Sequence, residues 1–154
     1  MEVFGDYAYY YNAFYGDKNY KEEAATVNSL IKKYNSNCKS LLNLGCGTGR
    51  HDVELHKLGY KVHGIDLSSD MIEIAKKNEN SNLSFEVSDI RTYKSAEKYD
   101  AVISLFHVIS YQNSNEDVIS AFKVANDALK EKGNIFIFDA WYGGGCCLIS
   151  RLYG

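Results

Sequence analysis

LLNLGCGTGR, Leu41 to Arg50, contains the clearest structural signal in the chain. A short apolar run leads directly into three glycines that alternate over five positions, Gly45, Gly47 and Gly49. Glycine tolerates positive φ and lets a ligand lie against bare backbone. A helix that begins behind such a loop favours an anionic group at its N-terminus. Because loops of this type also occur as plain tight turns, the loop alone is a weak indication of a ligand site.

Apolar runs alternate with helical patterns on both sides of this loop. Five runs have the length and the β-branched or aromatic content of strands, at residues 41–44, 61–66, 83–87, 99–106 and 134–141. Amphipathic patterns predict helices at residues 20–34, 50–59, 68–78 and 115–133, the last one ending at Gly133. Such alternation is typical of a parallel sheet covered by helices. We therefore predict an α/β fold, a Rossmann-like three-layer sandwich with a mainly parallel sheet.

The length of 154 residues fits one domain, and no repeat, linker or domain boundary interrupts it. Within the single domain 1–154 we distinguish an aromatic N-terminal segment 1–36, a core 40–141 and a short tail 142–154. The net charge of −3 does not favour nucleic acid or an anionic membrane as partners. The N-terminus has neither the basic start nor the apolar segment of a secretion signal. We therefore expect a cytoplasmic protein.

The four cysteines, Cys38, Cys46, Cys146 and Cys147, form no CxxC pair. Adjacent cysteines are poorly placed to bridge each other or to share a metal. We expect all four to be reduced and to act as small buried apolar residues.

An acidic residue ends the second predicted strand. Asp66 lies about twenty residues after the first glycine, the spacing at which an acid accepts hydrogen bonds from ribose hydroxyls. An isolated Asp here would more simply cap the following helix, but together with the loop it favours ribose binding. The glycine spacing G-x-G-x-G is one residue shorter than the G-x-G-x-x-G of dinucleotide-binding loops. This spacing therefore argues against a nicotinamide-dependent oxidoreductase.

With these features the chain resembles the class I S-adenosylmethionine (SAM)-dependent methyltransferases. Residues 41–77 resemble the first two motifs of that family, and VSDI at 87–90 resembles the third. YDAVISLFHVISY at 99–111 resembles the fourth, and LKEKGNIFIFD at 129–139 resembles the helix, glycine and strand that follow. The resemblance implies SAM as cofactor and methyl transfer as the reaction.

The resemblance also implies how the cofactor is held. The loop backbone, with Gly45, Cys46, Gly47 and Gly49, would hold the methionine portion. Asp66 would bind both ribose hydroxyls, and the carbonyl of Leu105 would accept from the cofactor ammonium.

Four further residues would surround the adenine. Leu67 and Met71 would pack against the ring, Asp89 would accept a hydrogen bond from its amino group, and the backbone of Ile90 would lie beside it. From the residues alone, Met71 and Ile90 are equally explained as core side chains, and Asp89 as a solvated strand end.

The aromatic segment YYYNAFYGDKNYKEEA, residues 9–24, resembles a narrower branch. Small-molecule methyltransferases that N,N-dimethylate nucleotide-linked amino sugars often begin with Y-D-x-F-Y. Tyr11, Phe14 and Tyr15 match this pattern, while Asn12 replaces the acid. The resemblance implies that Tyr11 and Tyr15 close over the cofactor and line the substrate entrance. The alternative is an aromatic helix face that seals one edge of the sheet.

Methyl transfer requires alignment of a nucleophile with the activated carbon, which supplies roughly 7–11 kcal/mol. His107 is the candidate general base because it follows the fourth strand and histidine titrates near neutrality. A hydrogen-bonded structural histidine is the alternative. Tyr142 and Asp139 follow the fifth strand at the same mouth, and with Tyr11 and His107, Tyr142 completes the candidate catalytic set. A lone Asp139 is too little for a metal site, so we predict no metal.

The resemblance ends soon after the fifth strand. Class I methyltransferases continue with a helix and a pair of antiparallel strands, whereas here only WYGGGCCLISRLYG follows. We therefore expect five parallel strands, no antiparallel strands after them, and an edge that the tail or a second copy of the chain must cover. The favoured function is a SAM-dependent methyltransferase acting on a small molecule such as an amino-sugar nitrogen. The alternative is a catalytically inactive, shortened SAM-binding domain that acts as a partner subunit or is a remnant.

Overall fold

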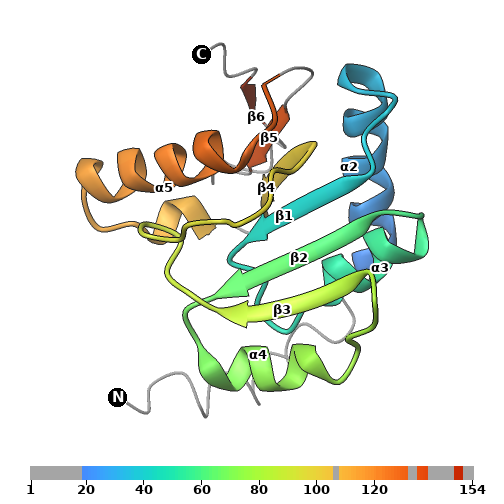
Figure 1. Ribbon diagram of the computed structural model, residues 1–154, viewed down its shortest axis with the longest axis horizontal. Helices are drawn as coiled ribbons and strands as arrows, with labels where there is room; N and C mark the ends of the chain where they lie inside the picture. The colour runs from blue at the N-terminus through green and yellow to red at the C-terminus, as the bar shows by residue number, and fades with distance from the viewer. Residues whose placement is uncertain (1–18, 106–107, 132–134, 139–147, 151–154) are drawn as a thin grey trace.

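The computed structural model describes residues 19–105, 108–131, 135–138 and 148–150. Within them, a six-stranded sheet has the order β3-β2-β1-β4-β5-β6 (Figure 1). Its strands are β1 (Ser40–Leu44), β2 (Lys61–Asp66), β3 (Leu83–Val87), β4 (Ala101–Ser104), β5 (Ile135–Phe138) and β6 (Leu148–Ser150). β1 to β5 are parallel, and β1 lies between β2 and β4. Ligands of such sheets bind at the carboxyl ends of the strands, where the strand order reverses beside β1.

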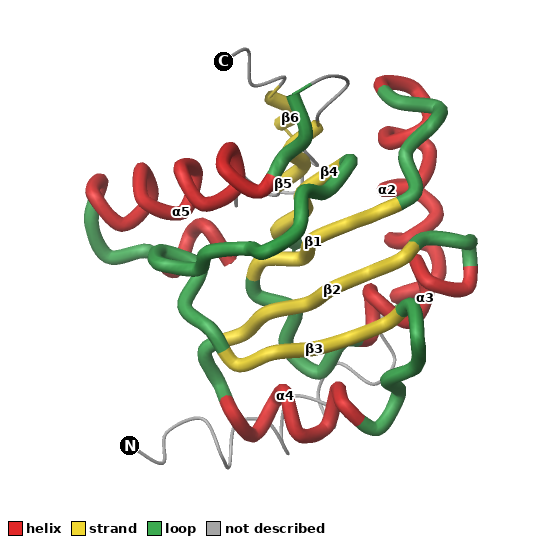
Figure 2. The backbone as a smooth tube through the Cα atoms, viewed as in Figure 1, coloured by secondary structure: helices red, strands yellow, loops and turns green. Residues whose placement is uncertain are grey.

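Helices cover both faces of the sheet (Figure 2). α2 (Tyr20–Tyr34), α3 (Arg50–Lys57) and α4 (Ser69–Lys76) contribute to one apolar cluster with the sheet. α5 (Asn115–Ala128) and the short 3-10 helix η2 (Val108–Tyr111) contribute to a second cluster. Alternation along β1 produces the two cores, since Leu41 belongs to the first and Leu42 and Leu44 to the second. The predicted Rossmann-like sandwich is confirmed.

Serine side chains cap the N-termini of α4 and α5. The Ser68 hydroxyl accepts from the backbone N–H of Met71 at the start of α4, at 3.3 Å. Ser114 does the same for Asp117 at the start of α5, at 3.1 Å. Such caps satisfy backbone donors that the helix itself leaves free. α3 differs, because its first turn follows Gly49 in the left-handed conformation without a side-chain cap.

α5 ends at Ala128, five residues before the predicted stop at Gly133. Leu129 is extended, with φ −84° and ψ 144°, and forms a parallel bridge with Tyr99. The N–H of Tyr99 donates to the carbonyl of Ala128 at 2.8 Å, and the N–H of Lys130 donates to the carbonyl of Tyr99 at 3.0 Å. The chain leaves the helix because these backbone groups pair with the segment that leads into β4.

The structure also corrects the expected end of the sheet. β6, a three-residue strand in the tail, pairs antiparallel with β5, so that Phe136 lies opposite Ser150. The edge of β5 that was expected to be open is therefore paired by the tail. A free edge presents unpaired N–H and C=O groups, and β6 satisfies them. Among the described residues, no helix is long and apolar enough to cross a membrane.

Candidate functional site

The glycine loop follows β1 and leads into α3. Gly45, Gly47 and Gly49 have φ values of 81°, 58° and 77°, a region that side chains strain. A Cβ at Gly45 would lie 2.5 Å from a methyl carbon of Val108, and one at Gly49 would lie 2.6 Å from the ring of Phe85. A Cβ at Gly47 would meet no described residue within 4 Å. Packing therefore requires two of the glycines, while the backbone of Gly47 is uncovered by the described residues.

Asp66 holds this loop from the neighbouring strand. Its Oδ2 accepts from the backbone N–H of Gly47, and its Oδ1 accepts from the backbone N–H of Ser68, both at 2.9 Å. Burial raises the pKa of Asp66, against the lowering effect of these two hydrogen bonds. Each carboxylate oxygen has a second lone pair, so two hydroxyl donors can still bind. Ser68, not Asp66, caps α4, so the helix-cap interpretation of Asp66 is wrong.

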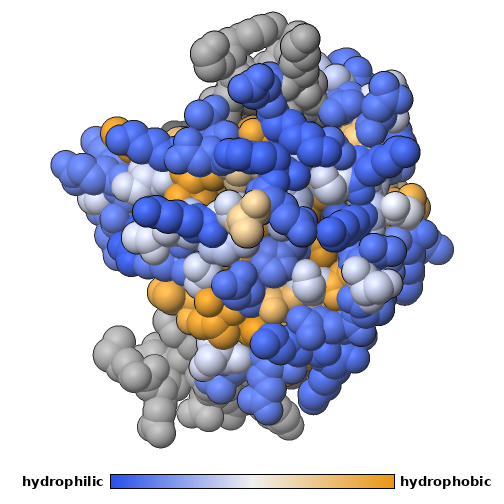
Figure 3. Space-filling model, in the orientation of Figure 1, coloured by the Kyte–Doolittle hydropathy of each residue, from blue (hydrophilic) through white to orange (hydrophobic). Residues whose placement is uncertain are grey.

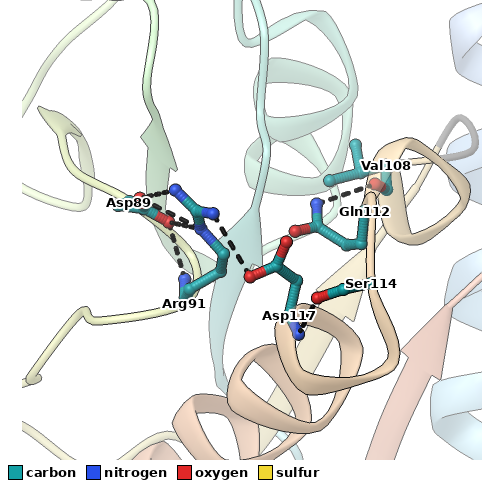
Figure 4. Close-up of polar contacts among 6 residues, drawn as sticks. All are labelled: Asp89, Arg91, Val108, Gln112, Ser114 and Asp117. Atoms are coloured by element: carbon teal, nitrogen blue, oxygen red, sulfur yellow. Dashed lines mark hydrogen bonds and ion pairs between the residues drawn. The ribbon is translucent and has the colours of Figure 1, made fainter.

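Asp89 lies two residues after β3 and faces Arg91 (Figure 4). The Arg91 Nη2 donates to Asp89 Oδ2 at 2.7 Å, and Arg91 Nε donates to Oδ1 at 3.0 Å. Arg91 Nη1 also reaches Asp117 Oδ1 at 3.3 Å. Hydrogen bonding from Arg91 lowers the pKa of Asp89, which stays ionised at neutral pH. Asp89 is therefore a fixed, charged acceptor and not a freely solvated strand end.

Apolar surface lies over the carboxyl ends of β2 and β3 (Figure 3). Leu67 and Val87, at the ends of these strands, are 63% and 47% exposed. Met71 is buried, and Ile90 and Leu105 belong to the cores on opposite faces of the sheet. Core packing thus accounts for the side chain of Ile90. Leu67 is the predicted adenine-contacting side chain that is open to solvent.

The predicted residues come together at one end of the sheet. The Asp66 carboxylate accepts a hydrogen bond from the glycine loop. The Asp66 carbonyl accepts from the N–H of Ser88 at 3.0 Å, and Asp89 is the next residue after Ser88. Leu105 follows β4, the other neighbour of β1. Some predicted site residues lie outside the described residues: Tyr11, Phe14, Tyr15, His107, Asp139 and Tyr142. The general base and the aromatic cover therefore stay predictions.

A buried polar pair below the loop was missed by the sequence analysis. Asp52 on α3 is fully buried, and both its oxygens accept from Asn43 Nδ2, at 3.2 and 3.0 Å. Asn43 Oδ1 has no partner among the described residues. Burial raises the pKa of Asp52 to about 7, and the charge of Asp66 acts in the same direction. One polar residue within the apolar run LLNL was the available signal for this pair.

The cysteines that the structure describes behave as predicted. Cys38 and Cys46 are free and buried. Burial raises the pKa of Cys46, which keeps the thiol protonated and unreactive. Cys146 and Cys147 lie outside the described residues. In the part of the chain that is described, no cluster of three or more His, Cys, Asp or Glu side chains could hold a metal ion.

Comparison with known proteins identifies the family. A model described as a methyltransferase domain matches residues 41–133, more than half of the chain. The chain belongs to this methyltransferase domain family. The matched region contains the glycine loop, Asp66, Asp89 and Arg91, which belong to the candidate site.

Three relatives illustrate the range of the family. The chain is 29% identical over 139 residues to a dTDP-3-amino-3,4,6-trideoxy-alpha-D-glucopyranose N,N-dimethyltransferase from Streptomyces venezuelae, covering 89% of this chain and 58% of that protein. A ubiquinone biosynthesis O-methyltransferase from Pelagibacter ubique is 30% identical over 100 residues, covering 63% and 40%. The solved structure of SAM-bound CalS10, an amino pentose methyltransferase from Micromonospora echinaspora, matches with a TM-score of 0.79 and 25% identity, covering 88% and 57%. The chain thus spans somewhat more than half of the first and third proteins.

Proposed function

We propose that this chain binds SAM on the glycine loop and that the protein to which the chain belongs transfers a methyl group to a small-molecule acceptor. One observation carries the proposal: no described residue covers the backbone of Gly47, while the carboxylate of Asp66 accepts from its N–H at 2.9 Å. A methionine chain can lie on that backbone, and the remaining lone pairs of Asp66 suit two ribose hydroxyls.

The surroundings of the loop fit the rest of the cofactor. The exposed side chains of Leu67 and Val87 offer apolar surface for adenine beside Asp66. Asp89 is an ionised acceptor at the end of the next strand and suits the adenine amino group. When bound, SAM supplies a methyl group on a sulfonium, which makes that carbon electrophilic. The described residues bind and orient the cofactor, and alignment is the main contribution that such a site makes.

An amino-sugar nitrogen is the proposed acceptor. The dimethyltransferase from Streptomyces venezuelae and CalS10, an amino pentose methyltransferase, support it, and Tyr11, Phe14 and Tyr15 match the pattern of that branch. His107 remains the proposed base, with Tyr11 and Tyr142 at the entrance and Tyr15 over the cofactor. An amine attacks in its neutral form, so a base of modest strength is sufficient. A cytoplasmic location also remains part of the proposal.

Calorimetric titration with S-adenosylhomocysteine (SAH) tests the cofactor assignment. We expect the chain to bind SAH and the Asp66→Ala variant to bind it at least about tenfold more weakly, because hydrogen bonds to a charged group are lost. Asp70→Ala is the matched control, since Asp70 is an exposed acid on the adjacent helix. Failure of the unmodified chain to bind SAH would contradict the proposal.

Methyl transfer from SAM then tests the acceptor. A nucleotide-linked amino sugar and its hydroxyl analogue, compared by mass spectrometry, distinguish N- from O-methylation. Binding of SAH without transfer to any amine or hydroxyl would instead favour the non-catalytic SAM-binding alternative.

A further inference from the structure

Arg91 holds the carboxylate of Asp89 from three directions. Its backbone N–H donates to Oδ1 at 2.8 Å, Nε donates to Oδ1 at 3.0 Å, and Nη2 donates to Oδ2 at 2.7 Å. The backbone N–H groups of Thr92 and Tyr93 donate to the carbonyl of Asp89 at 3.1 and 3.0 Å, so a turn fixes the main chain as well. Both the position and the orientation of the carboxylate are therefore set by the loop that contains Arg91.

One acceptor position of the Asp89 carboxylate is held more weakly than the others. An ionised carboxylate has about four lone pairs, two on each oxygen. The three shortest contacts fill both positions on Oδ1 and one on Oδ2. The remaining lone pair, on Oδ2, accepts only the longer arm of a bifurcated hydrogen bond from Nε, at 3.2 Å, and a ligand donor can replace that arm. Asp89 is 21% exposed at its side chain, so a ligand can reach this atom.

We propose that Arg91 is the positioning residue of the adenine subsite, because it directs the weakly held lone pair of Asp89 Oδ2 at the 6-amino group of the cofactor. The inference rests on the proposed function and deepens it. Asp89 touches the adenine, while Arg91 acts through Asp89. The site then selects a purine that carries a 6-amino donor, because a fixed acceptor without its donor is left unpaired.

The geometry explains why an arginine is needed here. A guanidinium is planar and presents its donors in a fixed fork that matches the two oxygens of a carboxylate. A lysine ammonium would supply the charge but not this orientation. An Arg91→Lys variant therefore separates the charge of residue 91 from its shape.

Arg91 also contacts the first turn of α5 (Figure 4). Its Nη1 reaches Asp117 Oδ1 at 3.3 Å, and the N–H of Asp117 is capped by Ser114. Gln112 Nε2 donates to the carbonyl of Val108 at 3.3 Å, and Val108 packs against Gly45 of the glycine loop. Asp117 therefore keeps the guanidinium in place from the α5 side, as a second and weaker support.

The test compares two ligands, SAH and its purine-riboside analogue, which lacks the 6-amino group. The unmodified chain should bind SAH about tenfold more tightly than the analogue. Arg91→Gln should lose about tenfold in SAH affinity and leave the affinity for the analogue within about twofold, so that the selectivity disappears. Arg91→Lys should retain part of the selectivity, and Asp117→Asn should retain most of it.

Lys130→Gln is the matched control, because Lys130 pairs with Asp100 at 2.9 Å and is likewise half-exposed, but lies at the opposite end of the strands. It should change neither affinity, and thermal unfolding should show that all variants fold. Equal losses for both ligands in Arg91→Gln, or no loss for either, would overturn the inference while the proposed function stands. Failure of the unmodified chain to bind either ligand would instead contradict the proposed function, and this inference with it.

Discussion

The carboxylate of Asp66, the last residue of β2, accepts a hydrogen bond of 2.9 Å from the backbone N–H of Gly47 in the loop after β1. Its other oxygen accepts from the N–H of Ser68 just before α4, also at 2.9 Å. One side chain therefore fixes two of the loops at the point where the strand order reverses. The shape of the glycine loop depends on a residue about twenty positions further along the chain.

Replacement of Gly49 by Ala should destabilise the fold through a specific clash. The new Cβ would lie 2.6 Å from the Phe85 ring, at a φ of 77° that Ala rarely adopts. We expect a loss of about 2–4 kcal/mol in the free energy of unfolding, measured with urea. Adding Phe85→Leu should recover about 1–2 kcal/mol relative to the sum of the two single changes. Strictly additive effects would show that the clash is not the cause.

Asp52→Asn should stabilise the protein more at high pH than at low pH. The pKa of Asp52 is raised to about 7 in the folded state. Its neutral form contributes stability that is fully present below the unfolded pKa near 4 and is lost as pH rises toward 7. At about 1.4 kcal/mol for each unit of pKa, the variant should gain up to about 4 kcal/mol at pH 8.

Urea unfolding at pH 5 and pH 8 measures this difference. Asp70→Asn, at an exposed position on α4, is the control and should follow the unmodified chain at both pH values. An Asp52→Asn variant that gains equally at both pH values would mean that Asp52 is already ionised at pH 5. The free-energy cost of burying the Asp52 carboxylate would then be smaller than its raised pKa implies.

Ile149→Pro should expose the edge of β5. Ile149 lies opposite Ile137 in the antiparallel pair, and proline has no N–H to donate within a strand. The freed edge of β5 can then pair with another chain. Analytical ultracentrifugation should show more self-association for the variant than for the unmodified chain at the same concentration. Equal association would mean that β6 is not what protects this edge, and a second copy of the chain would remain the predicted cover.

Sequence patterns predicted the centre of the fold closely. The predicted bounds of β2 and β3 agree with the structure, and a serine lies at the predicted start of α4 and caps it. The period-two pattern of strands and the local chemistry of caps need only neighbouring residues to be read. The end of α5 depends instead on Leu129 pairing with Tyr99, about thirty residues away, a contact that no local pattern contains.

In the candidate site, too, local sequence patterns predicted some features, and other features depend on tertiary contacts. The alternating glycines and Asp66 were predicted because backbone conformation and strand position restrict them to few residue types. Asp89 was predicted as an acceptor, but the role of Arg91 was not, because an arginine beside an acid is common on solvated loops. Only the tertiary structure places Asp117 on its other side. The partnership of Asn43 and Asp52 likewise required the packing of α3 on β1.

Calorimetric titration of SAH into Gly47→Ala and Gly59→Ala tests the central claim most directly. Both glycines have positive φ, 58° and 104°, and a Cβ at either position would meet none of the described residues within 4 Å. The two changes therefore introduce backbone strain without a clash, but only Gly47 lies in the proposed site. We predict that Gly47→Ala binds SAH at least about tenfold more weakly than the unmodified chain, and that Gly59→Ala binds it equally well. Equal affinities of the two variants would contradict the claim that the cofactor lies on the bare backbone of the glycine loop.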